Sequence, residues 1–162
     1  MATFMKTIWN VEGAILLFLP IAGTAFAADD DALFRILMRA DIAHNFAAYC
    51  AQFDPLILQR TRGSQGDMQE LSQRIRDEVI SGLPTDEAYQ LVLRSAKAAQ
   101  VGALTTIRQL YGPDPDEERA RLKNWCEVSV TPSLKQFVSD YDEHHEAFEE
   151  SIRKAKEAVP KP

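Results

Sequence analysis

The sequence predicts an all-α protein, a four- or five-helix bundle with mostly antiparallel helices, which follows a cleaved signal peptide. Apolar residues recur at spacings of three and four, and no stretch alternates in the way that predicts a strand. Glycine and proline fall almost only between these amphipathic stretches, where they end helices and form short connections. Short connections between long helices favour antiparallel neighbours.

The first 27 residues have the order of an export signal. A weakly positive start with Lys6 is followed by an apolar run over 15–21, and Ala25-Phe26-Ala27 has small residues where a signal peptidase reads them. The apolar run is shorter than the roughly 20 residues of a membrane-spanning helix. We therefore expect cleavage after Ala27 and export to the bacterial periplasm. An uncleaved anchor and a translation start at Met5 are the alternatives.

Removal of residues 1–27 leaves one domain, which we place at 28–158 with a flexible tail at 159–162. The chain has 18 Lys and Arg against 24 Asp and Glu, a formal net charge of −6. Such a chain is repelled by phosphate backbones and anionic lipids, so we expect no nucleic-acid partner and no binding to membrane surfaces. We also expect no membrane span after signal cleavage.

Two cysteines, Cys50 and Cys126, lie in the predicted mature domain. An even count in an exported chain favours a disulfide, and two buried free thiols are the alternative. The chain-entropy model gives such a long-range crosslink roughly 4 kcal/mol of stabilisation. The spacing excludes a Cys-x-x-Cys redox pair and covalent c-type haem.

The first predicted helix covers 29–53. Asp29-Asp30-Asp31 suits its positive N-terminal end, and Asp54-Pro55 ends it. Apolar residues surround this helix almost completely, which predicts a central position in the bundle. They include Leu33, Phe34, Ile36, Leu37, Met38, Ile42, Phe46, Ala47, Tyr49, Cys50 and Phe53.

The next two helices are predicted at 67–81 and 85–111. Asp67 and Glu70 occupy capping-box positions at the start of the former, and Thr85 is the expected N-cap of the latter. The helix at 85–111 has one face of small residues, for which we favour close packing inside the bundle over a dimer interface. These residues are Ala88, Val92, Ser95, Ala99 and Gly102.

The fourth helix begins after Asp114, a predicted N-cap with Pro115 at the first helical position, and reaches about Val130. Thr131-Pro132 is expected to break or kink it. A fifth helix covers 132–157. Its inner seam has coiled-coil spacing, and its outer face is acidic and predicted to be solvated. The seam is Leu134, Val138, Tyr141, His145, Phe148, Ile152 and Ala155, and the acidic residues are Asp140, Asp142, Glu143, Glu146, Glu149 and Glu150.

Histidines are the candidates for a metal site. Asp41-x-x-His44 and Asp142-x-x-His145 each place a carboxylate and an imidazole on one helix face. The ligand pattern of di-metal four-helix bundles is similar, although it uses Glu and needs two further carboxylates. We favour the simpler interpretation that His145 is a core histidine bonded to a neighbour.

Two further interpretations use His145. Met38 on the first helix and His145 on the last are residue types that could hold a non-covalent haem, although Met38 suits a plain core position. Protonation of a seam histidine near pH 6 could also loosen the bundle, as in an acid-responsive chaperone.

The chain has no catalytic or nucleotide-binding motif. We therefore expect a non-enzymatic exported protein that binds a protein partner or client, in an adaptor, stress or chaperone-like role, and that needs no cofactor. The alternative is a bundle that binds a metal ion or haem through histidines on the first and last helices. A small-molecule enzyme is a third possibility.

Overall fold

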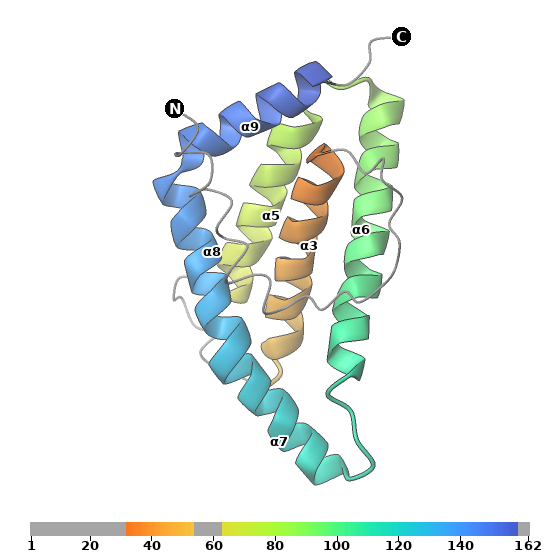
Figure 1. The fold of residues 1–162 in the computed structure, drawn as a ribbon, viewed down its shortest axis with the longest axis vertical. Coiled ribbons are helices and arrows are strands. Elements are labelled where there is room, and N and C mark those ends of the chain that lie inside the picture. The colour runs from red at the N-terminus through yellow and green to blue at the C-terminus, as the bar shows by residue number, and fades with distance from the viewer. Residues whose placement is uncertain (1–31, 54–62, 159–162) are drawn as a thin grey trace.

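The computed structural model describes residues 32–53 and 63–158, and it contains no strand within these ranges. The predicted all-α bundle is therefore confirmed (Figure 1). Helix α3 (Ala32–Cys50) lies in the middle, α5 (Gln65–Ile80) runs antiparallel beside it, and α6 (Thr85–Arg108) flanks its other side. The predicted signal and tail lie outside the described residues.

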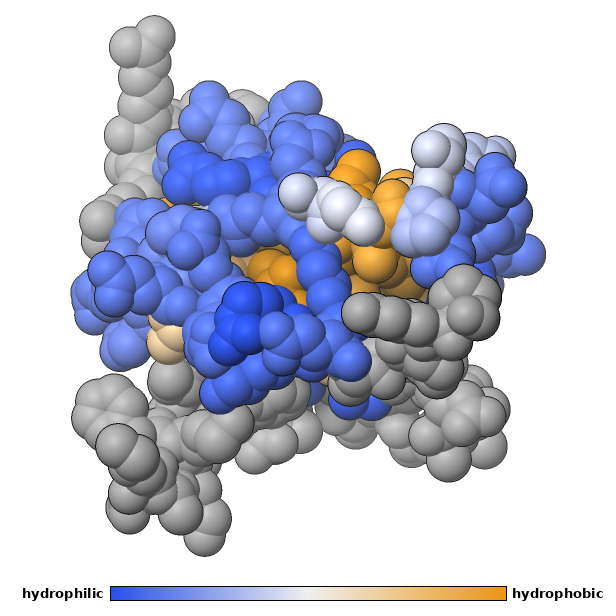
Figure 2. All heavy atoms as spheres, turned by 90° about the horizontal axis from the view of Figure 1, so that it is seen from above, coloured by the Kyte–Doolittle hydropathy of each residue, from blue (hydrophilic) through white to orange (hydrophobic). Residues whose placement is uncertain are grey.

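The second half of the bundle is one long bent helix followed by a short crossing helix. Helices α7 (Pro115–Trp125) and α8 (Thr131–Glu143) are joined by the π-helical turn η2 (Cys126–Val130), and α9 (His145–Ala158) crosses one end of the bundle (Figure 1). Seen from that end, most of the described surface is hydrophilic, and hydrophobic atoms show in a hollow between the polar side chains (Figure 2). With α7, η2 and α8 counted as one, the described residues form five helices.

The helix starts differ from the predictions at two places. Helix α5 begins two residues early, because Ser64 is its N-cap and forms a reciprocal capping box with Asp67. Helix α6 begins at Thr85 itself after Pro84, with no side-chain cap. The predicted start of α7 is confirmed, since the Asp114 carboxylate accepts hydrogen bonds from the amides of Asp116 and Glu117.

Pro132 kinks the helix but does not end it. The Thr131 amide donates to the Cys126 carbonyl five residues back, and its Oγ1 donates to the same oxygen at 2.9 Å. This wider turn lets the helix continue through a residue that lacks an amide proton. The helix ends instead at His144 (φ −123°, ψ 26°). The single helix predicted over 132–157 is therefore two helices, α8 and α9.

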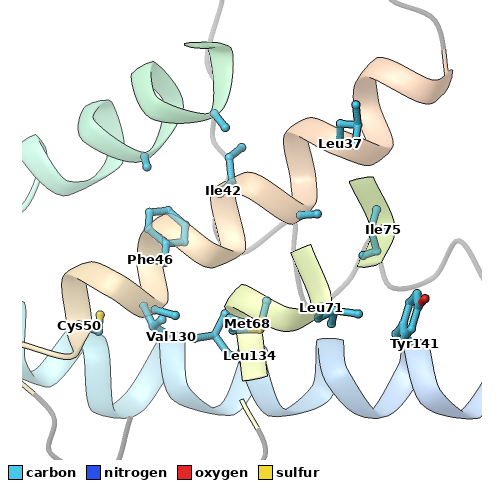
Figure 3. Close-up of a cluster of buried hydrophobic side chains, with 14 of the residues drawn as sticks. Leu37, Ile42, Phe46, Cys50, Met68, Leu71, Ile75, Val130, Leu134 and Tyr141 are labelled. Atoms are coloured by element: carbon cyan, nitrogen blue, oxygen red, sulfur yellow. The ribbon is translucent and has the colours of Figure 1, made fainter. Parts of the chain in front are cut away.

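The core lies around α3, as the sequence predicts. Side chains of α3 contact the helices on every side: Ile42 faces α6, and the Phe46 ring lies 5.2 Å from that of Trp125 on α7 (Figure 3). Burial of each large aliphatic or aromatic side chain contributes about 1.5–3 kcal/mol. The α5 and α8 members of this cluster are Met68, Leu71, Ile75, Leu134 and Tyr141.

Helix α6 packs closely on α3 through small residues. Ser95 and Ala99 are fully buried, and a Cβ placed on Gly102 would lie 3.7 Å from Ile42 Cδ1. The prediction that the small residues face the bundle interior is therefore confirmed.

The disulfide between Cys50 and Cys126 is confirmed. Both cysteines are fully buried, and their Cα atoms are 5.4 Å apart. The bridge attaches the end of α3 to the first residue of η2. Across residues 32–53 and 63–158, no helix is long and apolar enough to cross a membrane.

Candidate functional site

His145 is the first residue of α9 and lies at the junction of α9 with α5. Its ring centroid is 5.0 Å from that of Tyr141, its neighbour in the predicted seam. The side chain is 39% exposed, so His145 lies at the edge of the seam and not in a dry core. The groups that contact this ring therefore determine whether the site can bind a ligand.

Two carboxylates from different helices lie beside the His145 ring. His145 Nε2 is 3.2 Å from Glu149 Oε1 and 3.9 Å from Glu78 Oε1. Glu149 is one helical turn along α9, and Glu78 comes from the last turn of α5. We name these three residues the α5–α9 cluster. Within the described part of the chain, it is the only group of three or more His, Cys, Asp or Glu side chains with ligand atoms within 4.8 Å of one another.

Neighbouring groups orient the Glu78 carboxylate. Tyr141 Oη donates a 2.7 Å hydrogen bond to Glu78 Oε1. Burial, together with this bond and the Glu78 charge, raises the pKa of Tyr141, so the phenol stays a donor at neutral pH. Lys156 Nζ donates to the backbone oxygens of Glu78 and Ser81 at 2.6 and 2.7 Å, at the C-terminal end of α5 where cations are favoured.

The predicted Asp41–His44 pair faces different surroundings. Asp41 is buried on α3, and its Oδ1 accepts hydrogen bonds from Ser72 Oγ and Arg76 Nη2, both at 3.0 Å. His44 is partly buried, and its Nδ1 has no hydrogen-bond partner. Asp41 therefore links α3 to α5.

The structure does not gather the four predicted metal ligands. The α5–α9 cluster contains His145 but none of the other three predicted ligands, which are Asp41, His44 and Asp142. Asp142 is exposed on α8, and the helix ends at His144, so Asp142 and His145 do not share a continuous helical face. Metal binding through that set stays a prediction.

The haem prediction is also untested. Met38 is a partly buried residue of α3 that packs against the hydrophobic core. This placement suits the plain core methionine that the sequence favours.

The outer face of α6 is the second unusual feature. Four large apolar residues stay exposed there, with exposed fractions of 63, 49, 57 and 43% for Tyr89, Leu93, Val101 and Leu104. We name these four residues the α6 outer face. The buried stripe of the same helix is Leu91, Ser95, Ala99, Ala103 and Ile107.

Most of the exposed stripe of α6 faces away from the buried stripe, but Leu104 borders it, because buried Ile107 is three residues further along the helix. Tyr89 and Leu93 each precede a buried residue by two positions, which corresponds to about 200° of rotation. From Ala88 to Pro113 the sequence has no Asp or Glu, while Arg94, Lys97 and Arg108 are basic. The only carboxylates of α6, Asp86 and Glu87, lie in its first turn, so the exposed surface from Leu93 to Arg108 is apolar and basic.

Sequence reasoning missed both features for different reasons. The exposed apolar stripe could have been found, because its period and the lack of acidic residues are visible in the sequence. The His145-x-x-x-Glu149 spacing was also visible. Glu78 could not have been found, since only the crossing of α9 over α5 brings it to His145.

The chain matches no known protein-family model, and searches of curated proteins and of solved structures gave no significant match.

Proposed function

We propose that this protein acts in the bacterial periplasm by binding another protein and not by catalysis. We propose further that its partner presents an acidic amphipathic helix to the α6 outer face. The observation that carries this proposal is the exposure of Tyr89, Leu93, Val101 and Leu104 on a helix that already buries its opposite side. A surface helix needs only one apolar face to join its own core.

The shape of the α6 outer face favours a helical partner. From Tyr89 to Leu104 the face covers 15 residue steps of helix α6, so it is about 22 Å long. An amphipathic helix binds such a surface through apolar anchors three or four residues apart. The face is small compared with a stable interface, which buries about 800 Å² on each partner, so we expect weak and reversible binding.

Charge selects the kind of helix. Lys97 and Arg108 flank the exposed apolar residues, and no carboxylate of α6 lies among them. A partner with acidic residues beside its apolar stripe would be attracted to this surface, while a basic partner would be repelled.

Two observations support export. The Cys50–Cys126 disulfide is typical of oxidising compartments, and residues 1–27 have the order of a signal peptide. The full chain, expressed for export in a bacterial host, should be recovered from the periplasm. Its intact mass should equal that of a chain that begins at Ala28. Recovery only as the unprocessed cytoplasmic chain would contradict export without affecting the binding proposal.

The binding test uses the protein purified from that fraction and two labelled helical peptides. Both peptides carry the same leucine stripe, flanked by Glu in one and by Lys in the other. Fluorescence anisotropy should show binding of the acidic peptide only. Leu93→Ser with Val101→Ser should weaken it at least about tenfold, because two apolar anchors become polar.

Val128→Ser is the matched control, since Val128 is 65% exposed but lies on η2 and not on α6. Its affinity should equal that of the wild type. Equal binding of both peptides, or an unchanged affinity of the double variant, would overturn the proposal. Two other results would also overturn it. If the protein self-associates through α6, a second copy occupies this face. If the wild type binds anionic vesicles and the double variant does not, a lipid surface occupies it.

A further inference from the structure

The α5–α9 cluster has the donors of a metal site. Glu78, His145 and Glu149 offer one imidazole nitrogen and two carboxylate oxygens, all within 4.8 Å of one another. The donors come from two helices that are distant in sequence. Glu149 and His145 share a face of α9, and Glu78 reaches them from the end of α5.

The distances fit a tetrahedral ion. Zinc binds histidine nitrogen and carboxylate oxygen at about 2.0–2.2 Å, which places neighbouring tetrahedral ligands about 3.4 Å apart. His145 Nε2 lies 3.2 Å from one carboxylate oxygen and 3.9 Å from the other. Small side-chain rotations would therefore bring all three donors to one ion.

Two buried atoms of the cluster lack a hydrogen-bond partner. These atoms are Glu78 Oε2 and His145 Nδ1. Buried polar atoms are normally satisfied by protein, water or an ion. An ion bound through Glu78 Oε2 would satisfy that oxygen, while Oε1 keeps its hydrogen bond from Tyr141.

The surrounding charges leave the donors accessible. Tyr141 donates to Glu78 Oε1, which orients the carboxylate as groups around metal ligands commonly do. The nearby cation Lys156 donates to backbone oxygens of Glu78 and Ser81. Arg74 lies over the Tyr141 ring, 5.8 Å from its centroid. Each of these cations therefore contacts another group, and neither forms an ion pair with Glu78, His145 or Glu149.

We propose that Glu78, His145 and Glu149 bind a zinc ion, with water as the fourth ligand. A mixed imidazole and carboxylate set suits zinc, whereas magnesium and calcium prefer oxygen alone. Bound zinc would fasten the start of α9 to the end of α5, opposite the end of α3 that the disulfide holds (Figure 1). This site is independent of the α6 outer face.

The test is a titration with zinc chloride of the exported, processed protein after all metal has been removed. Calorimetry should give one zinc ion per chain, and the Tm should rise on binding, because zinc stabilises the folded state that it binds. Cobalt in place of zinc should give the intense visible bands of a tetrahedral site. Tyr141→Phe should weaken zinc binding about 10- to 100-fold, and His145→Gln and Glu149→Gln should weaken it further.

The controls are His144→Gln and Glu146→Gln, which alter an imidazole and a carboxylate next to the cluster. Zinc affinity should stay within about twofold in both, because neither residue belongs to the α5–α9 cluster. Circular dichroism of the metal-free variants checks that each one folds. Zinc binding that is absent, that survives in both His145→Gln and Glu149→Gln, or that falls equally in the controls would overturn the proposal.

Discussion

The outer faces of α6 and of α8–α9 are both the solvent sides of long helices, yet opposite residue types form them. Helix α6 exposes large apolar side chains among basic residues, whereas α8 and α9 expose Asp142, Glu143 and Glu146. Solvation alone accounts for the acidic face. An apolar stripe opposite the buried side of α6 is instead typical of an interaction surface. The comparison is the reason why we propose α6, and not α8–α9, as the binding side.

The two sides are also held to the central helix by different means. Small residues pack α6 closely on α3, whereas the Cys50–Cys126 disulfide and the polar contacts of Asp41 hold the other side. Volume changes should therefore affect the α6 side, and changes of redox state should affect the α7–α8 side.

The largest effect is expected from loss of the disulfide. Cys50→Ala with Cys126→Ala should lower the free energy of unfolding by about 2–5 kcal/mol, because the crosslink restricts the unfolded chain. Urea unfolding measures this loss. Hydrogen exchange should accelerate more in α7–α8 than in α6, and an unchanged stability would contradict the role of the bridge.

A smaller loss should follow when the α3–α6 contact is overfilled. Ala99 is fully buried, so Ala99→Leu should cost about 1–3 kcal/mol in urea unfolding. Leu104→Ala on the outer face of the same helix should change stability by less than about 0.5 kcal/mol. Equal losses in the two variants would show that α6 does not have one buried and one free side.

Alkaline pH should destabilise the α6 side and the α7–α8 side, because one tyrosine on each side loses its proton. Burial and a hydrogen bond with Tyr111, at the end of the α6 side, raise the pKa of Tyr49 from 10.0 to about 12, and burial beside Glu78 raises that of Tyr141. A raised pKa contributes stability that is present below pH 10 and is lost as pH rises through the folded value. Unfolding followed from pH 9 to 11 should be less pH-dependent in Tyr49→Phe, and an unchanged slope would contradict the burial of this phenol.

The smallest effect is expected on the acidic face. Arg153 and Lys154 lower the pKa of Glu150 to about 2, but all three side chains are solvent-accessible, so water and salt screen these ion pairs. Glu150→Gln should leave the urea midpoint unchanged. A clear shift would show that the acidic face does more than keep α9 solvated.

The sequence predicts the helices and the core well, because they depend on local patterns. The spacing of apolar residues shows that α3 is the central helix. It also identifies the inward-facing small residues of α6 and the seam from Leu134 to Ala155. Of the two outcomes predicted at Thr131-Pro132, the kink and not the break is found, because the π-helical turn at Cys126–Val130 accommodates the missing amide, and no local pattern revealed this turn.

The candidate sites are predicted less completely than the fold. His145 was identified from its seam position. Asp142 does not share a helical face with it, because α8 ends at His144, and Asp142 is exposed to solvent. Glu78 meets His145 only after α9 turns back over α5. Contacts of this kind depend on the angle between helices, which apolar spacing does not determine.

The most direct test of the central claim maps where an acidic amphipathic helix binds. The account predicts that NMR shift changes in the isotope-labelled protein, on addition of the leucine and glutamate peptide, are largest around Tyr89, Leu93, Val101 and Leu104. The amides of α8 and α9 should change little. Shift changes centred on α8–α9 would contradict the claim. The absence of any shift change at peptide concentrations up to the millimolar range, where the weakest specific complexes form, would also contradict it.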